Sequence, residues 1–189
     1  MYKTLFLLFL EILPVLIFFA VGQRATFSDA TLVYIMATIL TLGIVWHWAG
    51  RVSYLSLILS TIVIGAGSLS VWLHNPQILI LVDTIYYLGA ALTLLILKLS
   101  GTNLYYIMFK DTFGMNSAGW DILVTRWVVA LILVGIGNEL VRQLGTIPDW
   151  FIFQISKTIL LIIFSGYQFR LTREYRTPNN TNSWGVRIS

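Results

Sequence analysis

Long apolar stretches separated by short polar breaks run along almost the whole chain. Each is close to the roughly 20 residues that an α-helix needs to cross the hydrocarbon of a bilayer. In hydrocarbon every backbone amide must bond within its own segment, and the alternating pattern of a β-barrel strand is absent from the sequence. The pattern therefore predicts an all-α polytopic transmembrane bundle. Its six spans cover residues 4–21, 30–48, 54–73, 78–97, 124–144 and 150–169.

The longest break, between the fourth and fifth spans, has a helical pattern of its own. Leu104, Ile107, Met108 and Asp111 recur at helical spacing, with aromatic residues between them and Lys110 within reach of lipid phosphate. We interpret this segment as a short interfacial helix, and an ordinary loop is the alternative. After the last span, Asn, Thr and Ser dominate and few apolar residues remain. We expect residues 1–176 to form the integral membrane domain and residues 177–189 a disordered cytoplasmic tail.

Composition supports a chain whose main solvent is lipid. Hydrophobic residues make up 58% of the sequence and charged residues 11%, and the mean hydropathy is +0.83. Spans of this length use up most of the 189 residues, so no sizeable soluble domain is expected. The absence of cysteine excludes disulfides, thiolate metal sites and cysteine nucleophiles. The basic residues occur singly among apolar runs, so the pI of about 9.5 does not indicate a nucleic-acid partner.

The distribution of Lys and Arg predicts the orientation, because short loops rich in these residues stay in the cytoplasm. The six-span model puts only Arg24 and Arg142 on the opposite side from the termini. A five-span model without the first segment would move only the N-terminus, and the first segment lacks the cleavage site of a signal peptide. We therefore predict an inner-membrane, multi-pass protein with both termini in the cytoplasm. Nine basic residues lie on the side of the termini: Lys3, Arg51, Lys98, Lys110, Arg126, Arg170, Arg173, Arg176 and Arg187.

Several polar residues lie inside the predicted spans, where each ionisable group costs roughly 2.5–3.5 kcal/mol unless it finds a partner or water. They form a charge relay or substrate site in one interpretation and buried pairs that fix helix packing in the other, and we favour the second. Glu11 and Lys157 lie deepest, so we predict that they are partners across the first and sixth helices. Pro14, which removes an amide donor, should loosen the first helix. The candidate intramembrane polar or functional residues are Glu11, Pro14, Asp83, Asn138, Glu139 and Lys157.

Small residues recur at three- or four-residue spacing along the third span. Lipid provides no hydrophobic drive for helices to associate, so small faces favour close backbone approach. We expect this helix to lie at the bundle centre or at a dimer interface. The candidate helix-packing residues are Ser56, Ser60, Gly65 and Gly67.

Nothing in the sequence indicates catalysis. The Ser and Thr residues do not accompany a base and an orienting acid, and a glycine-rich phosphate loop is absent. His47 and His74 are isolated from each other, so no metal site is expected. We predict neither an enzyme nor a bound cofactor.

Short sequence fragments recur along the chain in a specific order and spacing. They are Phe9-Leu10-Glu11-Ile12-Leu13-Pro14 with Phe18-Phe19, Ala37-Thr38, Leu69 to His74-Asn75, Thr84-Ile85-Tyr86, the segment from Leu104, the series Trp120, Leu123, Trp127 and Asn138, and Trp150 with Phe153. Together they resemble the intracellular septation protein A family, also called the inner-membrane-spanning protein YciB family, over roughly residues 5–172. Two positions depart from the family pattern, because Val82 and Asp83 stand where a basic residue is usual and Gln154 replaces a lysine. Lys157, one helical turn further on, is a candidate substitute for that lysine.

The resemblance implies an integral protein of the bacterial inner membrane that is associated with cell-envelope synthesis and normal septation, without an enzymatic activity. Our leading hypothesis is a non-enzymatic membrane scaffold of cell division. The expected partners are membrane lipid and other integral membrane division or envelope-synthesis proteins, and a homo-oligomer is a further expectation. The competing hypothesis is a small secondary transporter or lipid-handling protein, based on the intramembrane charges and Pro14.

Overall fold

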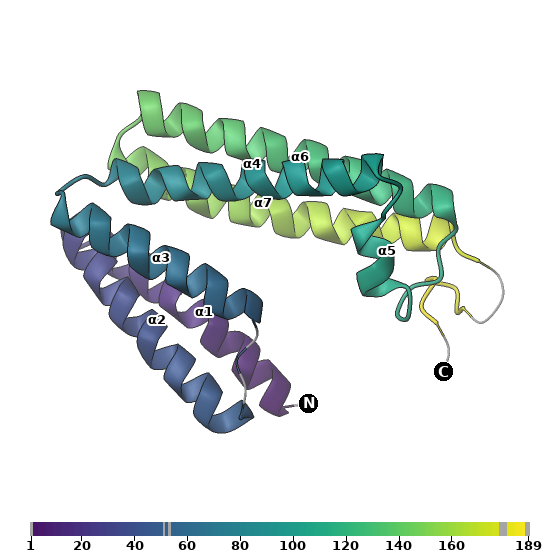
Figure 1. The fold of residues 1–189 in the computed structure, drawn as a ribbon, viewed down its shortest axis with the longest axis horizontal. Coiled ribbons are helices and arrows are strands. Elements are labelled where there is room, and N and C mark those ends of the chain that lie inside the picture. Colours follow the sequence, from purple (N-terminus) through teal and green to yellow (C-terminus); the bar gives the residue numbers. More distant parts are fainter. Residues whose placement is uncertain (1, 51, 53, 178–180, 188–189) are drawn as a thin grey trace. The chain divides into compact units, whose positions relative to one another are not determined.

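The computed structural model describes residues 2–50, 52, 54–177 and 181–187, and it describes side chains from Leu10 onward with the exception of Glu11, Tyr54 and Leu55 in the helices. The described residues form an all-α structure without named strands, which confirms the predicted fold class (Figure 1). Its helices are α1 (Tyr2–Gly22), α2 (Phe27–Ala49), α3 (Tyr54–Trp72), α4 (Gln77–Leu99), α5 (Leu104–Phe109), α6 (Ser117–Leu144) and α7 (Ile147–Glu174).

Each of the six predicted spans is a helix. Among the described residues, α2, α4, α6 and α7 are long and apolar enough to cross a membrane by length and composition. The described parts of α1 and α3 that count as apolar helices are shorter, Ile12–Gly22 and Ser56–Trp72. The predicted interfacial segment is also helical, since α5 begins after Asn103, whose side chain accepts a hydrogen bond from the Tyr106 amide.

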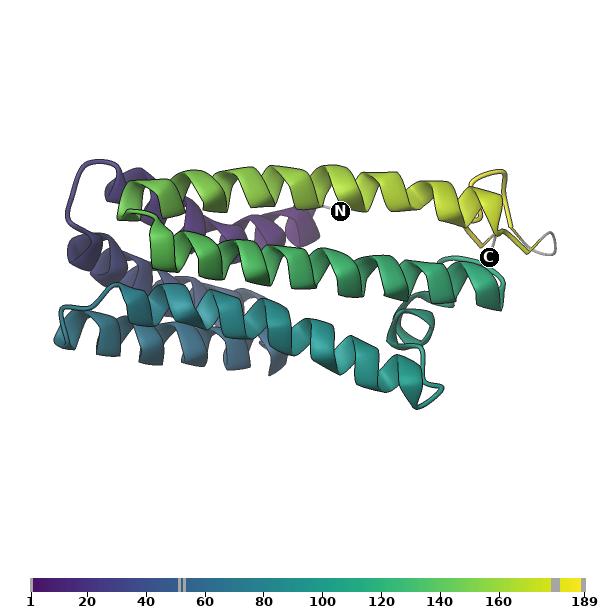
Figure 2. The same ribbon diagram turned by 90° about the horizontal axis from the view of Figure 1, so that it is seen from above.

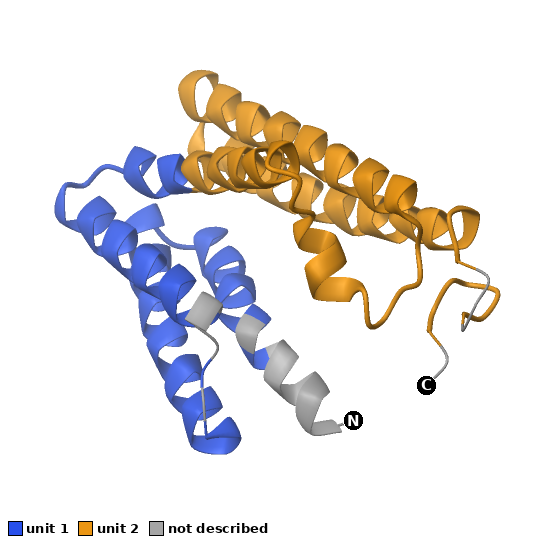
Figure 3. Ribbon diagram, turned by 45° about the vertical axis from the view of Figure 1, so that its right-hand side comes forward, with its two compact units in different colours: residues 1–82 blue, residues 83–189 orange. Residues whose placement is uncertain are grey.

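The chain divides into two compact units at α4 (Figure 3). Unit 1 covers residues 1–82 and contains α1, α2, α3 and the first turns of α4. Unit 2 covers residues 83–189 and contains the remainder of α4 together with α5, α6 and α7.

Unit 1 is a three-helix assembly in which α2 packs against both α1 and α3. Thr26 caps the start of α2 by accepting a hydrogen bond from the Asp29 amide, and Gly50 ends it in the left-handed region at φ 69°. A cavity of about 260 Å³ lies between the three helices. Its lining includes three of the candidate residues, Pro14, Ser56 and Ser60, together with Thr38.

The two candidate glycines of α3 differ in their surroundings. A Cβ atom at Gly67 would lie 3.1 Å from Ile35 Cδ1 and 3.2 Å from Thr31 Cγ2, so α3 approaches α2 closely there. Among the described residues of unit 1, no atom lies within 4 Å of a Cβ built at Gly65. Gly67 therefore lies at a close contact between α3 and α2, as expected for a helix-packing residue. Gly65 faces away from α2 within this unit.

In unit 2, α4, α6 and α7 run alongside one another, as Figures 1 and 2 both show. The turn between α6 and α7 consists of Gly145 and Thr146, and Thr146 caps α7 in a capping box with Asp149. A Cβ at Gly135 on α6 would lie 2.7 Å from Leu88 Cδ2 on α4, so this glycine allows a close crossing of the two helices. The core between α4 and α6 consists of Ala91, Leu94, Val124, Val128 and Leu131.

Part of the tail after α7 is described, and its backbone is hydrogen-bonded to the loop before α6, while the disorder predicted for residues 177–189 stays a prediction. The Gly114 amide donates to Gly185 O at 2.9 Å, the Arg187 amide to Thr112 O at 2.9 Å, and the Thr177 amide to Gly114 O at 2.8 Å. Gly185 has φ 73°, and a Cβ there would lie 2.0 Å from Thr172 O. Backbone hydrogen bonds, which composition does not report, hold Thr177 and residues 181–187 against the loop before α6.

Candidate functional site

Polar side chains from three helices of unit 2 meet inside the bundle. The helical repeat places each set on one face, because residues three, four and seven apart lie above one another. The opposite face of α7 carries exposed Ile152, Ile155 and Ile159 and is suited to lipid. The converging residues are Asp83, Thr84 and Tyr87 of α4, Asn138 and Glu139 of α6, and Trp150, Gln154 and Lys157 of α7.

An ion pair joins α4 to α7. Lys157 Nζ lies 3.1 Å from Asp83 Oδ2, and the Gln154 amide donates to the same carboxylate oxygen. The lysine side chain is only 5% exposed, while that of the aspartate is 35% exposed. Lys157 Nζ also lies 4.5 Å from the centre of the Tyr87 ring, which adds a cation–π contact. The charged end of Lys157 is thus buried between the helices, whereas the Asp83 carboxylate is partly exposed at the surface of unit 2.

Asn138 lies at the centre of the network and is fully buried. Its Nδ2 donates to Thr84 Oγ1 at 2.9 Å, which joins α6 to α4. Its Oδ1 accepts from Trp150 Nε1 at 3.1 Å and from Gln154 Nε2 at 3.5 Å, which joins α6 to α7. One amide therefore ties three helices together, and replacing it would leave Thr84, Trp150 and Gln154 each with one buried hydrogen bond fewer.

A second ion pair lies toward the α6–α7 turn. Arg142 Nε donates to Glu139 Oε2 at 2.8 Å, and Gln143 Nε2 donates to Glu139 Oε1 at 2.6 Å. Thr84 Oγ1 donates to Glu139 Oε2 at 3.2 Å, so the threonine connects this pair to Asn138. The network accordingly contains two carboxylates and two cations, and their charges balance.

Such a network can have a structural role or a chemical role. Pairing offsets the cost of placing ionisable groups in hydrocarbon and selects one mutual rotation of the helices. Ionisable groups joined by hydrogen bonds can also pass protons or bind a polar solute. No group of three His, Asp or Glu side chains suited to a metal ion occurs in the part of the chain that the structure describes.

The structure brings four of the predicted residues together in this network: Asp83, Asn138, Glu139 and Lys157. The side chain of Glu11 lies outside the described residues, so its predicted pairing with Lys157 stays a prediction, and the partner that the structure gives Lys157 is Asp83. Pro14, Ser56, Ser60, Gly65 and Gly67 belong to unit 1 and are not members of the network.

Sequence reasoning missed Thr84, Tyr87, Trp150 and Gln154 as members of the network. One signal was available, because Gln154 lies three residues before Lys157 inside a predicted span and hence on the same helical face. The sequence gives no such signal for Thr84, because the hydroxyl of a threonine in a span usually donates to a backbone carbonyl of its own helix.

Comparison with known proteins gives a consistent result over nearly the whole chain. The model of the family described as intracellular septation protein A matches residues 6–178. An inner membrane-spanning protein YciB from Afipia carboxidovorans is 26% identical over 94% of this chain and 89% of its own length. Proteins of the same name from Nitrobacter hamburgensis and Brucella melitensis are 28% and 26% identical over 90% and 92% of this chain and 86% of their own lengths. No solved structure matches.

Proposed function

Since the chain belongs to the intracellular septation protein A family, we propose that it serves septation and cell-envelope synthesis as a membrane scaffold without an enzymatic activity of its own. It is a multi-pass protein of the bacterial inner membrane. In the proposed orientation both termini lie in the cytoplasm, in line with the excess of Lys and Arg on their side.

The observation that carries the scaffold proposal is the polar network of unit 2, whose side chains pair with one another. Asn138 uses both ends of its amide, and Asp83 and Glu139 each face a cation. Side chains that satisfy one another make a bundle with one fixed arrangement of helices, which is what a docking surface requires. A reactive group, by contrast, has to be left available to a substrate.

The exposed apolar faces of unit 2 support a partner within the membrane. Leu160, Ile162 and Ile163 on α7 are 65%, 67% and 63% exposed. Lipid satisfies such a face, and so does another transmembrane helix. The proposed partners are integral membrane proteins of division or envelope synthesis, with a second copy of this chain as a further candidate.

A photo-cross-linking experiment in living cells tests the scaffold proposal. A photoreactive residue at Ile162 or Leu160 should give discrete adducts with membrane proteins of the septation and envelope machinery. The matched control carries the same group at Val128, which is 6% exposed and packs inside unit 2. Adducts with lipid alone at every exposed position would count against a scaffold.

A second candidate function, a small secondary transporter or lipid-handling protein, is favoured by one specific observation. The Asp83 carboxylate is partly exposed although its partner Lys157 is buried, so a solute or proton could compete for it. The full chain reconstituted in liposomes with an internal pH dye or a labelled lipid tests this function. Movement that Asp83→Asn abolishes would favour transport, and leak equal to that of empty liposomes would exclude it for the probe used.

A further inference from the structure

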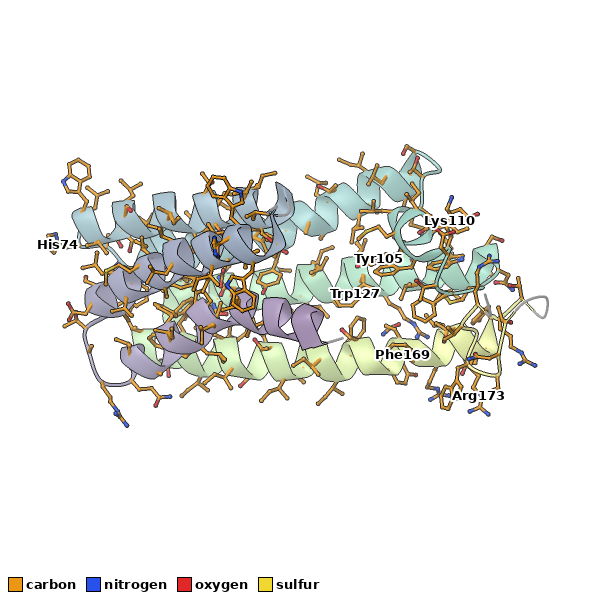
Figure 4. The ribbon with its side chains drawn as sticks, turned by 90° about the horizontal axis from the view of Figure 1, so that it is seen from below. His74, Tyr105, Lys110, Trp127, Phe169 and Arg173 are labelled. Carbon is orange, nitrogen blue, oxygen red and sulfur yellow. The ribbon has the colours of Figure 1, made fainter. Side chains whose placement is uncertain are left out.

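An aromatic pocket lies at the end of unit 2 that carries α5. It has a volume of about 250 Å³, and α5, α6 and α7 all contribute to its walls. Figure 4 labels one lining residue from each helix, Tyr105, Trp127 and Phe169, and it also labels Lys110 and Arg173 at the same end of the unit. The Tyr105 and Trp127 ring centres are 6.2 Å apart, and the Trp127 and Phe164 ring centres 5.1 Å. Ring packing of this kind holds the walls in place.

The polar side chains from α7 that line the pocket have partners of their own. Ser165 Oγ donates to Leu161 O at 2.7 Å, Gln168 Nε2 to Phe164 O at 3.1 Å, and Thr172 Oγ1 to Trp184 O at 2.8 Å. Gln168 Oε1 accepts from Arg126 Nη1 at 3.3 Å. Burial raises the pKa of the Tyr105 phenol to about 12, with a smaller contribution from Tyr86, so the phenol stays neutral. The pocket therefore offers hydrocarbon and uncharged rings to an occupant, which suits an acyl chain.

The surroundings of the pocket are basic. Residues 98–126 and 164–187 contain seven Lys and Arg residues against three Asp and Glu residues. Two of the three acids are already paired, Asp121 with Lys98 and Glu174 with Arg170, both at 3.3 Å. Lys110 and Arg173 lie over aromatic rings, those of Tyr106 and Trp184. Neither Lys110 nor Arg173 forms an ion pair among the described residues, so both charges can attract an anion.

The depth of this end in the membrane follows from α5. Tyr106, Ile107 and Met108 are 47%, 55% and 61% exposed on a short helix that joins two spans. An exposed apolar face next to Lys110 is typical of a helix at the boundary between headgroups and acyl chains. The pocket and the flanking cations then lie where a phospholipid presents its chain and its phosphate.

We propose that this end of unit 2 binds one anionic phospholipid of the surrounding bilayer, with an acyl chain in the pocket and the phosphate at its basic surroundings, to which Lys110 and Arg173 belong. The occupant is a lipid because one half of the site is hydrocarbon and the other half is cationic. This inference does not depend on the scaffold role or on which side of the membrane the end faces.

Thermal unfolding of the purified full chain in detergent tests the proposal. Dioleoylphosphatidylglycerol should raise Tm saturably, on the order of 5 °C, because a ligand that binds only the folded state stabilises it. Dioleoylphosphatidylcholine, with the same chains and no net charge, should give a much smaller shift, and inorganic phosphate none. Equal shifts with the two lipids, or a full shift with phosphate alone, would overturn the proposal.

Two variants separate the parts of the site. Ser165→Met places a larger side chain in the pocket and should abolish the lipid-induced shift, and the double variant Lys110→Gln with Arg173→Gln should remove the preference for the anionic lipid. Arg24→Gln, which removes one exposed charge from the α1–α2 turn, is the matched control and should behave as the parent chain. A parent-like shift and preference in both site variants would refute the site.

Native mass spectrometry provides a readout if Ser165→Met does not fold. The parent chain should retain one phosphatidylglycerol molecule at collision energies that strip phosphatidylcholine, and the double variant should lose both lipids alike. Retention of phosphatidylglycerol by the double variant at the parent level would contradict headgroup binding by Lys110 and Arg173.

Discussion

Lys157 of α7 is paired with Asp83 of α4 at 3.1 Å across 74 positions of the sequence. The pair joins two spans that are not neighbours along the chain and leaves the lysine almost fully enclosed. A fully buried pair costs 3–5 kcal/mol when one partner is removed, and the exposed edge of the carboxylate should reduce that cost.

We expect Lys157→Met and Asp83→Asn each to lower the free energy of unfolding by roughly 1–3 kcal/mol. The double variant should recover part of the combined loss, because neither charge is then left unpaired. Unfolding in detergent measures the coupling, and strictly additive losses would contradict the pair. A parallel cycle with Glu11→Gln and Lys157→Met tests the pairing that sequence reasoning predicted, since coupling there would restore Glu11 as a partner.

Asn138→Ala should be among the most damaging single substitutions in unit 2. It leaves the Thr84 hydroxyl, the Trp150 indole and the Gln154 amide with fewer partners, and each unsatisfied buried group costs about 1–3 kcal/mol. The measurement is thermal stability in detergent. Leu133→Ala on the same helix is the control, because Leu133 is 64% exposed and should tolerate truncation. Similar losses in both variants would argue against a central role for the amide.

The two glycines of α3 form a matched pair for a packing test. Gly67→Leu should destabilise the bundle by roughly 1–3 kcal/mol or more, since the new side chain would overlap Thr31 and Ile35. Gly65→Leu should have little effect on the free energy of unfolding of the isolated chain. If Gly65→Leu instead changes the oligomeric state on size-exclusion chromatography, the open face of α3 is a contact between copies.

Topology can be measured directly with reporter fusions. Reporters at the N-terminus and after Tyr175 should both report cytoplasm, and one after Gln77 should report the external side. The reason is the excess of Lys and Arg on the side of the termini. An external N-terminus would replace the six-span model with the five-span alternative.

The sequence by itself predicted the helices and their class, because hydrophobic length and turn residues are local properties of the chain. It also predicted α5, and it identified Asp83, Asn138, Glu139 and Lys157 singly, since a polar residue in an apolar run is conspicuous. Their membership in one network was not available from spacing, because it depends on how α4, α6 and α7 rotate toward one another.

Tertiary structure decided the rest for physical reasons that no linear pattern contains. Gly65 and Gly67 are equivalent as small residues, yet a step of two residues turns a helix by about 200°, so only Gly67 faces α2. The described tail residues are held by backbone hydrogen bonds to the loop before α6, and such bonds are open to almost any sequence. Composition determines which segments lie in lipid and which in water. The partner of a charged side chain, a glycine or a backbone amide depends on how the helices pack against one another.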